Sequence, residues 1–332
     1  MGVIISQKNR LIQVFKTYKM LLSIVGLLFF IILPIFLDSY GVYVISITLV
    51  MVIAAIGLNI TMGYAGQVSL CHAAFMGVGA YITALLVTNG YSFWLALPLV
   101  IVAEIALGIV IGYPSLKVKH MYLALVTLGF GRIFYVFVQN ASEITGGPTG
   151  IGGIDRPSIF FISLDSDLRF YYFILFTTLM VILTAQWIAK SKWGRAFKSL
   201  KENEVKACMI GINIRTYKLL AFIVGAIYAG IGGCVYATLL EYIGPSGFTD
   251  VVTFRIIMML VIGGLGRLEG AILGAGIVTL LPEALRAYEQ YYILIFSLIT
   301  MVMIIFIPKG GIFLIQNGYL KIKKLLTKGE SS

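Results

Sequence analysis

The stretch LNITMGYAGQVSLCHAAFMGVGAYITALL, residues 58–86, places glycines and polar side chains within a long apolar run. Glycines interrupt regular helix, and backbone N–H and C=O groups freed inside lipid must then meet protein, water or a solute. The stretch therefore predicts a broken helix at membrane depth. Its polar side chains either line a pathway or support helix packing, and both interpretations stay open for His72. The candidate pathway residues are Asn59, Gly63, Tyr64, Gly66, Gln67, Ser69 and His72.

The composition around this stretch predicts that the chain lies in lipid. Of its 332 residues, 60% are hydrophobic and 12% charged, with a mean hydropathy of +0.99. Soluble domains carry about 25% charged residues. The net charge of +11 comes from basic residues beside apolar segments, which fits membrane topology better than nucleic-acid binding. We expect one all-α transmembrane domain over residues 1–332 that contacts membrane lipid and no nucleic acid.

Apolar segments of about 20 residues predict the membrane spans. The eighth and ninth segments are short and are separated only by Gly266–Arg267, so re-entrant or broken helices are the alternative there. No cleavage site follows the first segment, which is therefore expected to be a retained helix and not a signal peptide. The ten candidates are 21–37, 41–62, 68–88, 92–112, 120–139, 169–189, 217–240, 251–265, 268–285 and 291–307.

The distribution of basic residues predicts the orientation. If the N-terminus is cytoplasmic, 20 of the 25 lysines and arginines fall in or next to inside segments, while the outside loops are mostly acidic. The chain is therefore expected in a plasma or inner membrane, with both termini on the cytoplasmic side. The inside segments are the tail 1–20, 63–67, 113–119, 190–216, 266–267 and the tail 308–332.

The inside loop 190–216 is predicted to form one amphipathic helix. Its apolar residues share one face when plotted at about 100° per residue, which suits the membrane surface or a groove in a partner protein. The apolar face comprises Phe197, Leu200, Val205, Cys208 and Ile212.

Small residues recur every four positions in the segment 217–240, which predicts a close-packed helix face within the chain or against a second subunit. These residues are Ala221, Gly225, Ala229, Gly233 and Ala237. Two short glycine motifs, GYAGQVS (63–69) and GGLGRLE (263–269), each sit at an inside break between spans. They are consistent either with an internal duplication or with chance in a glycine-rich chain.

Charged residues within the predicted spans are few. Glu104 and Arg132 lie at comparable depth on neighbouring spans, which predicts an ion pair. Arg255 lies one turn from the outer surface, where it can extend to water or attract a carboxylate.

Motifs for catalysis, nucleotide binding and metal binding are absent from the sequence. There is no GxxxxGK[ST], no HExxH and no paired cysteine motif among Cys71, Cys208 and Cys234. We expect no enzymatic activity, no catalytic residue, no metal site and no cofactor.

Several motifs together resemble the LivM-type permeases of the branched-chain amino acid ABC importers, over nearly the whole chain beyond residue 40. They are LNITMGYAGQVSLCHAAFMGVGAY (58–81), TGGPTGIGG (145–153), GRAFKSLKENEVKACMIGINI (194–214) and VIGGLGRLEGAILGA (261–275), with PEALR (282–286) and IPKGGI (307–312).

The resemblance implies a multi-subunit importer of Leu, Ile or Val. Its other parts would be a second, LivH-like permease, two ABC ATPase subunits and an extracytoplasmic amino-acid-binding protein. The loop 190–216 would be the segment that couples the permease to an ATPase. The resemblance assigns that role to Gly194, Arg195, Glu202, Asn203, Glu204 and Gly211. Arg132 departs from the family, whose members carry an acidic residue in this stretch.

Other transport functions remain open at this point. Related permeases move urea, amides, sugars or nucleosides, and the sequence separates these substrates poorly. A stand-alone secondary transporter would need intramembrane ionisable residues for ion coupling, for which only Glu104 and His72 qualify. A channel is a third class, and co-purifying ATPase subunits would exclude both.

Overall fold

The computed structural model describes residues 28–115, 120–159 and 162–285, together with Gly26 and a few positions between 294 and 301. Within these residues the protein is all-α, with only short strands in its loops. Five helices there are long and apolar enough to cross a membrane. They are α2 (Ser39–Leu58) continued by the π-helix η2 (Asn59–Tyr64), α4 (Phe93–Ser115), α5 (His120–Asn140), α7 (Asp167–Lys190) and α10 (Ile214–Leu240).

The prediction of ten spans is not confirmed. Three of the predicted spans form the shorter helices α3 (His72–Thr88), α11 (Asp250–Gly263) and α12 (Leu268–Ala284). At about 1.5 Å per residue, the 14 residues of α11 extend about 21 Å, less than the roughly 30 Å hydrocarbon layer. The first predicted span is described only in part and ends in the 3₁₀ turn η1 (Leu33–Phe36). The span 291–307 and both tails lie largely or wholly outside the described residues.

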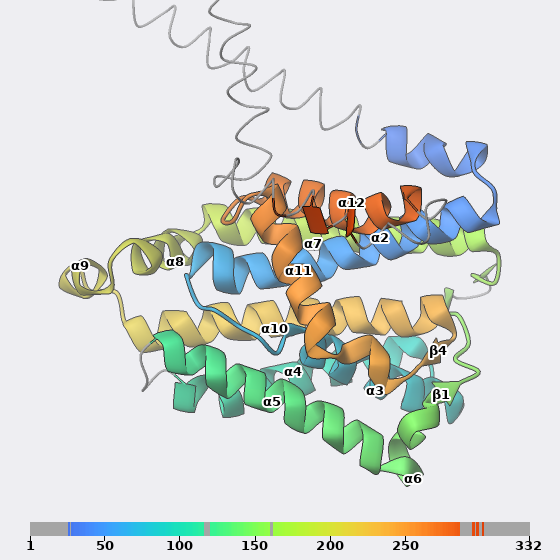
Figure 1. The fold of residues 1–332 in the computed structure, drawn as a ribbon, viewed down its shortest axis with the longest axis horizontal. Helices are drawn as coiled ribbons and strands as arrows, with labels where there is room; N and C mark the ends of the chain where they lie inside the picture. Colours follow the sequence, from blue (N-terminus) through green and yellow to red (C-terminus); the bar gives the residue numbers. More distant parts are fainter. Residues whose placement is uncertain are drawn as a thin grey trace, which may run out of the picture.

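Helix α10 forms the centre of the fold. It crosses the middle of the molecule, with α2, α7 and α12 on one side and α3, α4 and α5 on the other (Figure 1). In the most apolar windows, 72% of α2 and 61% of α10 is buried, against 22% of α5. The outer faces of α4, α5 and α7 expose large apolar side chains, as expected for surfaces that face lipid or a second membrane subunit.

The break predicted within residues 58–86 is an extended, buried segment between η2 and α3. Helix α3 begins at His72 and not at residue 68 as predicted, because residues 66–71 run outside regular helix. Near the C-terminal end of this segment, threonine hydroxyls of two other helices accept hydrogen bonds from backbone N–H groups. Leu70 donates to Thr127 Oγ1 of α5 at 3.0 Å, and Ala73 donates to Thr253 Oγ1 of α11 at 3.1 Å. Two backbone donors at the junction of the break and α3 thus find acceptors within the protein, as lipid requires.

The predicted outside loops gather at one end of the helices. There β1 (Ile151–Gly152) pairs antiparallel with β4 (Tyr242–Ile243), and β2 (Ser158–Ile159) pairs with β3 (Ile162–Ser163). The remaining turns at this end are α6 (Ser142–Thr145), η3 (Gly147–Thr149) and η4 (Pro245–Phe248). The predicted inside breaks 63–67 and 266–267 meet at the opposite end, next to α8 (Figure 1).

The loop 190–216 forms two helices, so the prediction of one amphipathic helix is wrong. Helix α8 (Lys192–Glu202) ends at Asn203, whose extended backbone begins α9 (Glu204–Met209) and whose side chain accepts the Lys206 N–H at 3.0 Å. A free side-chain acceptor at this position competes with continued helix and favours a cap. The predicted apolar face is therefore divided. Phe197 and Leu200 are buried, whereas Val205 and Cys208 are exposed.

The predicted Glu104–Arg132 ion pair is also wrong. Glu104 is fully buried against Gly230 of α10, and neither carboxylate oxygen has a hydrogen-bond partner among the described residues. Arg132 is on the exposed side of α5, and its guanidinium lies 5.1 Å from the centre of the Tyr135 ring. Depth along two helices was similar, but the two side chains point to different faces.

Candidate functional site

The two glycine motifs lie against each other at the predicted inner end. Gly66 follows η2 with φ +71°, and Gly266 lies between α11 and α12 with φ +82°, a left-handed conformation that favours glycine. A Cβ on Gly63 would lie 2.7 Å from the Gly266 nitrogen. The breaks in two helix pairs about 200 residues apart in sequence therefore form one junction.

Asn59 holds this junction together. Its side chain is completely buried. Its Oδ1 accepts the Gly266 N–H at 2.9 Å, and its Nδ2 donates to the Arg267 carbonyl at 3.1 Å. One amide thus pairs with a backbone donor and a backbone acceptor of the second break, and the Arg267 carbonyl also accepts the Ala271 N–H at 3.2 Å. We call Asn59, Gly63, Gly66, Gly266 and Arg267 the glycine clasp.

Helix α8 contacts the clasp directly through Lys201. The Lys201 Nζ donates to the Gly63 carbonyl at 2.7 Å. A Cβ on Gly66 would lie 3.4 Å from the Lys201 Cα, and one on Gly266 would lie 3.3 Å from its Nζ. The neighbouring Lys198 ammonium is 5.2 Å from the centre of the Tyr64 ring. Lys201 of α8 therefore contacts both helix breaks.

The other candidate pathway residues are buried among the chain's own helices. Gln67 Nε2 donates to the Lys218 carbonyl at 2.9 Å, and Ser69 Oγ lies 3.5 Å from the Cys71 sulfur. His72 Nε2 lies 2.9 Å from the Ala54 carbonyl of α2. These three side chains fasten the extended segment and do not share a common open surface, so their role in a pathway stays a prediction.

Residues predicted for ATPase coupling shape the α7–α8–α9 corner. Gly194 packs where a Cβ would lie 2.4 Å from the Ala189 carbonyl, which makes the turn from α7 into α8 tight. Arg195 donates to the Lys190 carbonyl at 3.1 Å. Glu204 pairs with Lys218 of α10 at 2.6 Å, and this ion pair ties α9 to the central helix. Glu202, Asn203 and Gly211 are exposed, as a docking surface requires.

The small-residue stripe of α10 packs inside the chain, so of the two predicted partners the structure supports the internal one. A Cβ on Gly225 would lie 2.9 Å from the Gly57 carbonyl of α2, and a Cβ on Gly233 would lie 1.9 Å from the Met76 carbonyl of α3. The alanines of the stripe, Ala221, Ala229 and Ala237, are completely buried. The stripe lets α10 lie close to two helices at once.

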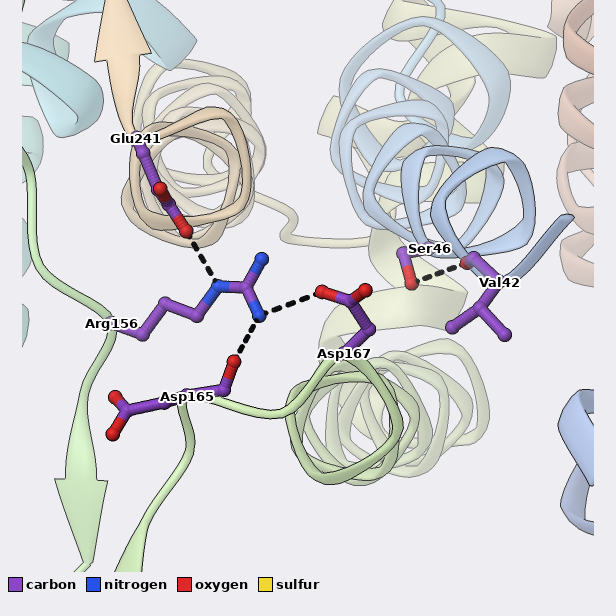
Figure 2. Close-up of polar contacts among 6 residues, drawn as sticks. All are labelled: Val42, Ser46, Arg156, Asp165, Asp167 and Glu241. Atoms are coloured by element: carbon purple, nitrogen blue, oxygen red, sulfur yellow. Dashed lines mark hydrogen bonds and ion pairs between the residues drawn. The ribbon is translucent and has the colours of Figure 1, made fainter. Parts of the chain in front are cut away.

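An ion-pair cluster at the opposite end was missed as a site by sequence reasoning. Arg156 Nε pairs with Glu241, which follows α10, and its Nη1 pairs with Asp167 at the start of α7, both at 2.8 Å (Figure 2). The same Nη1 donates to the Asp165 carbonyl at 2.8 Å. A usable signal was present, because Arg156 is one of few basic residues in outside loops that are otherwise acidic.

Comparison with protein families places these features in a known group. The model of the family described as "Branched-chain amino acid transport system / permease component" matches residues 40–308. The chain belongs to this family. The match includes the glycine clasp, both helices of the loop 190–216 and the Arg156 cluster.

Individual members of the family agree with this assignment. The chain is 31% identical to the high-affinity branched-chain amino acid transport system permease protein LivM of Escherichia coli (strain K12), over 96% of this chain and 80% of that protein. It is 26% identical to the probable branched-chain amino acid transport permease protein LivH of Methanocaldococcus jannaschii, over 83% and 92%. It is 25% identical to the autoinducer 2 import system permease protein LsrC of Escherichia coli O157:H7, over 79% and 78%. No solved structure matches this chain.

This permease component shows no metal site in the part of the chain that the structure describes. In those residues, Cys71 and Cys234 are buried and Cys208 is exposed, all three as free thiols. The chemistry available to the chain is that of a helix bundle with two polar junctions, one at each end.

Proposed function

We propose that this chain is the membrane-spanning permease subunit of an ABC importer for branched-chain amino acids, with ATP hydrolysed by separate subunits. Membership of the permease family supports the class. The similarity to LivM over 96% of the chain supports the substrate class. The sequence carries no P-loop, so partner proteins would supply the ATP hydrolysis.

The contact between α8 and the glycine clasp is the observation that carries the mechanism. We propose that α8 and α9 dock on an ATPase subunit and that Lys201 transmits the movement to the clasp. The Gly63 carbonyl receives the Lys201 ammonium, and Asn59 links Gly63's helix to the break between α11 and α12. A shift of α8 would therefore reposition two broken helices together, and broken helices commonly form the substrate site of transporters.

The passage itself is proposed to offer weak contacts only. A tight site midway would slow release, because conduction requires binding weak enough to leave. Asn59, Gln67, Ser69 and His72 would support the passage by holding its broken backbone, and none of them carries a permanent charge. The high-affinity selection of the substrate would fall to the extracytoplasmic binding protein.

The full assembly is proposed to contain a second, LivH-like permease, two ATPases and the binding protein. The exposed apolar faces of α4 and α5 leave room for membrane partners or lipid. We further propose ten membrane segments with both termini in the cytoplasm. A cysteine in place of Glu202, which is exposed on α8, should not react with an impermeant thiol reagent applied to intact cells. Strong labelling at that position would reverse the orientation and remove α8 from the ATPase side.

Uptake by reconstituted protein tests the proposed function. Proteoliposomes with the complete importer should accumulate labelled leucine against its gradient when ATP is supplied on the ATPase side and the binding protein on the other. The chain alone should accumulate none. Uphill uptake by the chain alone, driven by a proton or sodium gradient, would show a secondary transporter instead.

An ABC permease subunit for a different substrate is the alternative, and the similarity to LsrC favours it. Competition during leucine uptake separates the two proposals. Isoleucine and valine should compete with leucine, whereas sugars, urea and nucleosides should not.

A further inference from the structure

A partly open pocket of about 120 Å³ lies at the outer ends of α2, α7 and α10. A cavity needs only about 10–15 Å³ of such volume to hold one water, so this space can take a small molecule. We call it the outer pocket. Its polar wall is formed by Ser46, Arg156 and Asp167, and its apolar wall includes Val42, Phe170 and Leu239.

Arg156 is held in place but keeps capacity for a further contact. Its side chain is only 15% exposed, and two of its three nitrogens contact Glu241, Asp167 and the Asp165 carbonyl. A guanidinium has five N–H donors. Among the residues drawn in Figure 2, the second terminal nitrogen has no partner, and the second carboxylate oxygen of Asp167 points towards α2.

Backbone strain supports the same location. Glu241 has φ +56°, the one non-glycine residue with a positive φ in the described part of the chain. Such a conformation costs free energy and is found at functional sites more often than elsewhere. Here it places the Glu241 carboxylate on Arg156 at the end of the central helix.

We propose that the outer pocket binds the α-carboxylate and α-ammonium of a free amino acid, with its apolar side chain against Val42, Phe170 and Leu239. The site rests on the proposed function, for which it provides the first contact in this chain after release from the binding protein. The amino-acid carboxylate contacts Arg156, and the ammonium contacts Asp167.

The charges of the pocket suit a zwitterion better than a single ion. A zwitterion brings one carboxylate and one ammonium, so every charge that it displaces from an ion pair gains a replacement. A simple carboxylate would leave Asp167 without a partner, and a simple amine would compete with Arg156 for the same carboxylates. The exchange leaves little net gain in free energy, so binding is weak and release is fast.

Protection from thiol labelling tests the pocket. Tyr43 lines it and is 37% exposed, so a Tyr43→Cys variant with Cys208→Ser, in the complete importer without binding protein, reports access by a small thiol reagent. For a weak site, the dissociation constant of L-leucine is on the order of millimolar. At a leucine concentration about ten times that constant, labelling should slow about tenfold. Leucinamide lacks the carboxylate and 4-methylpentanoate lacks the ammonium, so neither should protect. Tyr91→Cys, exposed on another outer loop, should label at one rate throughout.

Two further variants separate the pocket from its ion pairs. Ser46→Leu fills the cavity from α2 without removing a charged residue and should abolish protection, whereas Ser46→Ala should retain it. Arg156→Gln should also abolish protection. Equal protection by all three compounds, no protection by leucine, or protection that persists in Ser46→Leu would overturn the proposal.

The leucine-protection experiment and the leucine-uptake experiment can fail independently of each other. Leucine uptake by the unmodified importer without leucine protection would refute the pocket and leave the proposed function intact. Protection without any uptake of branched-chain amino acids would support the pocket and refute the proposed function.

Discussion

At the glycine clasp a single ammonium group contacts a backbone carbonyl, whereas in the outer cluster a single guanidinium contacts two carboxylates. Both junctions join segments that are far apart in the sequence. The clasp meets α8 through the Lys201 ammonium on the Gly63 carbonyl, so this contact depends on the position of α8. The cluster places one guanidinium between two carboxylates, and these two ion pairs hold the outer loop to α7 and α10. On the proposals made above, the inner junction would move with α8, and the outer cluster would stay in place and contact the substrate.

Asn59→Leu is expected to have the largest effect on stability, because it breaks the clasp and leaves the outer cluster intact. It removes the acceptor of the half-buried Gly266 N–H, at a cost of about 1–3 kcal/mol, and one of two hydrogen bonds to the Arg267 carbonyl, which still accepts the Ala271 N–H. The midpoint of thermal unfolding in detergent should fall by several degrees. Asn89→Leu is the matched control, since Asn89 is exposed and bonds only within its own helix end. Equal shifts for both variants would mean that the clasp contributes nothing specific.

Gly233→Ala is expected to disturb both ends together, because α10 connects them. The new Cβ would lie 1.9 Å from the Met76 carbonyl, so α3 must move away, at a cost of about 1–3 kcal/mol. Thermal unfolding and recovery of the assembled importer are the measurements. Gly276→Ala on α12 meets nothing within 4 Å and should leave both unchanged. A normal midpoint for Gly233→Ala would show that the α3–α10 contact is loose.

Lys201→Met is expected to have the smallest effect on stability and a large effect on transport. The side chain lies partly in solvent, so the lost hydrogen bond contributes about 1 kcal/mol or less. Leucine uptake should fall severalfold while the ATPase subunits remain bound and hydrolyse ATP. Lys192→Met is the control. Lys192 is nine residues before Lys201, and at about 100° per residue this separation places the two side chains on opposite faces of α8. If Lys192→Met lost uptake to the same extent, the effect would belong to the helix charge and not to the clasp.

The sequence predicted the bounds of several long helices, but not which neighbours their side chains face. Apolar length located α4, α5, α7 and α10 to within a few residues, because lipid fixes the length of a span. The start of α3 was missed because hydropathy continues through residues 68–71, whereas the break is stabilised by Thr127 and Thr253 on remote helices. Glu104 and Arg132 were paired by depth alone, and depth does not show which face a side chain occupies.

The contacts of the candidate site could not be predicted from the sequence, and the functional role of its residues stays a prediction. Asn59, Gly63 and Gly66 were identified from one glycine-rich motif, and the similar motif around Gly266 was noted as a repeat. Neither pattern indicates that the two motifs touch, because no local periodicity encodes a contact across about 200 residues. Lys201 and Arg156 were likewise visible only as basic residues, since their partners are a backbone carbonyl and carboxylates in distant segments.

A distance measurement through the transport cycle tests the central claim most directly. Spin labels on cysteines replacing Glu202 of α8 and Leu265 of the second break would report on the clasp, and labels replacing Tyr91 and Tyr242 would report on the outer loops. All four positions are exposed, and Cys208→Ser leaves only buried native cysteines. In the complete importer, the account predicts that adding ATP changes the distance distribution of the inner pair, and that Lys201→Met weakens this change. An inner distance that stays constant while the labelled importer continues to take up leucine would contradict it.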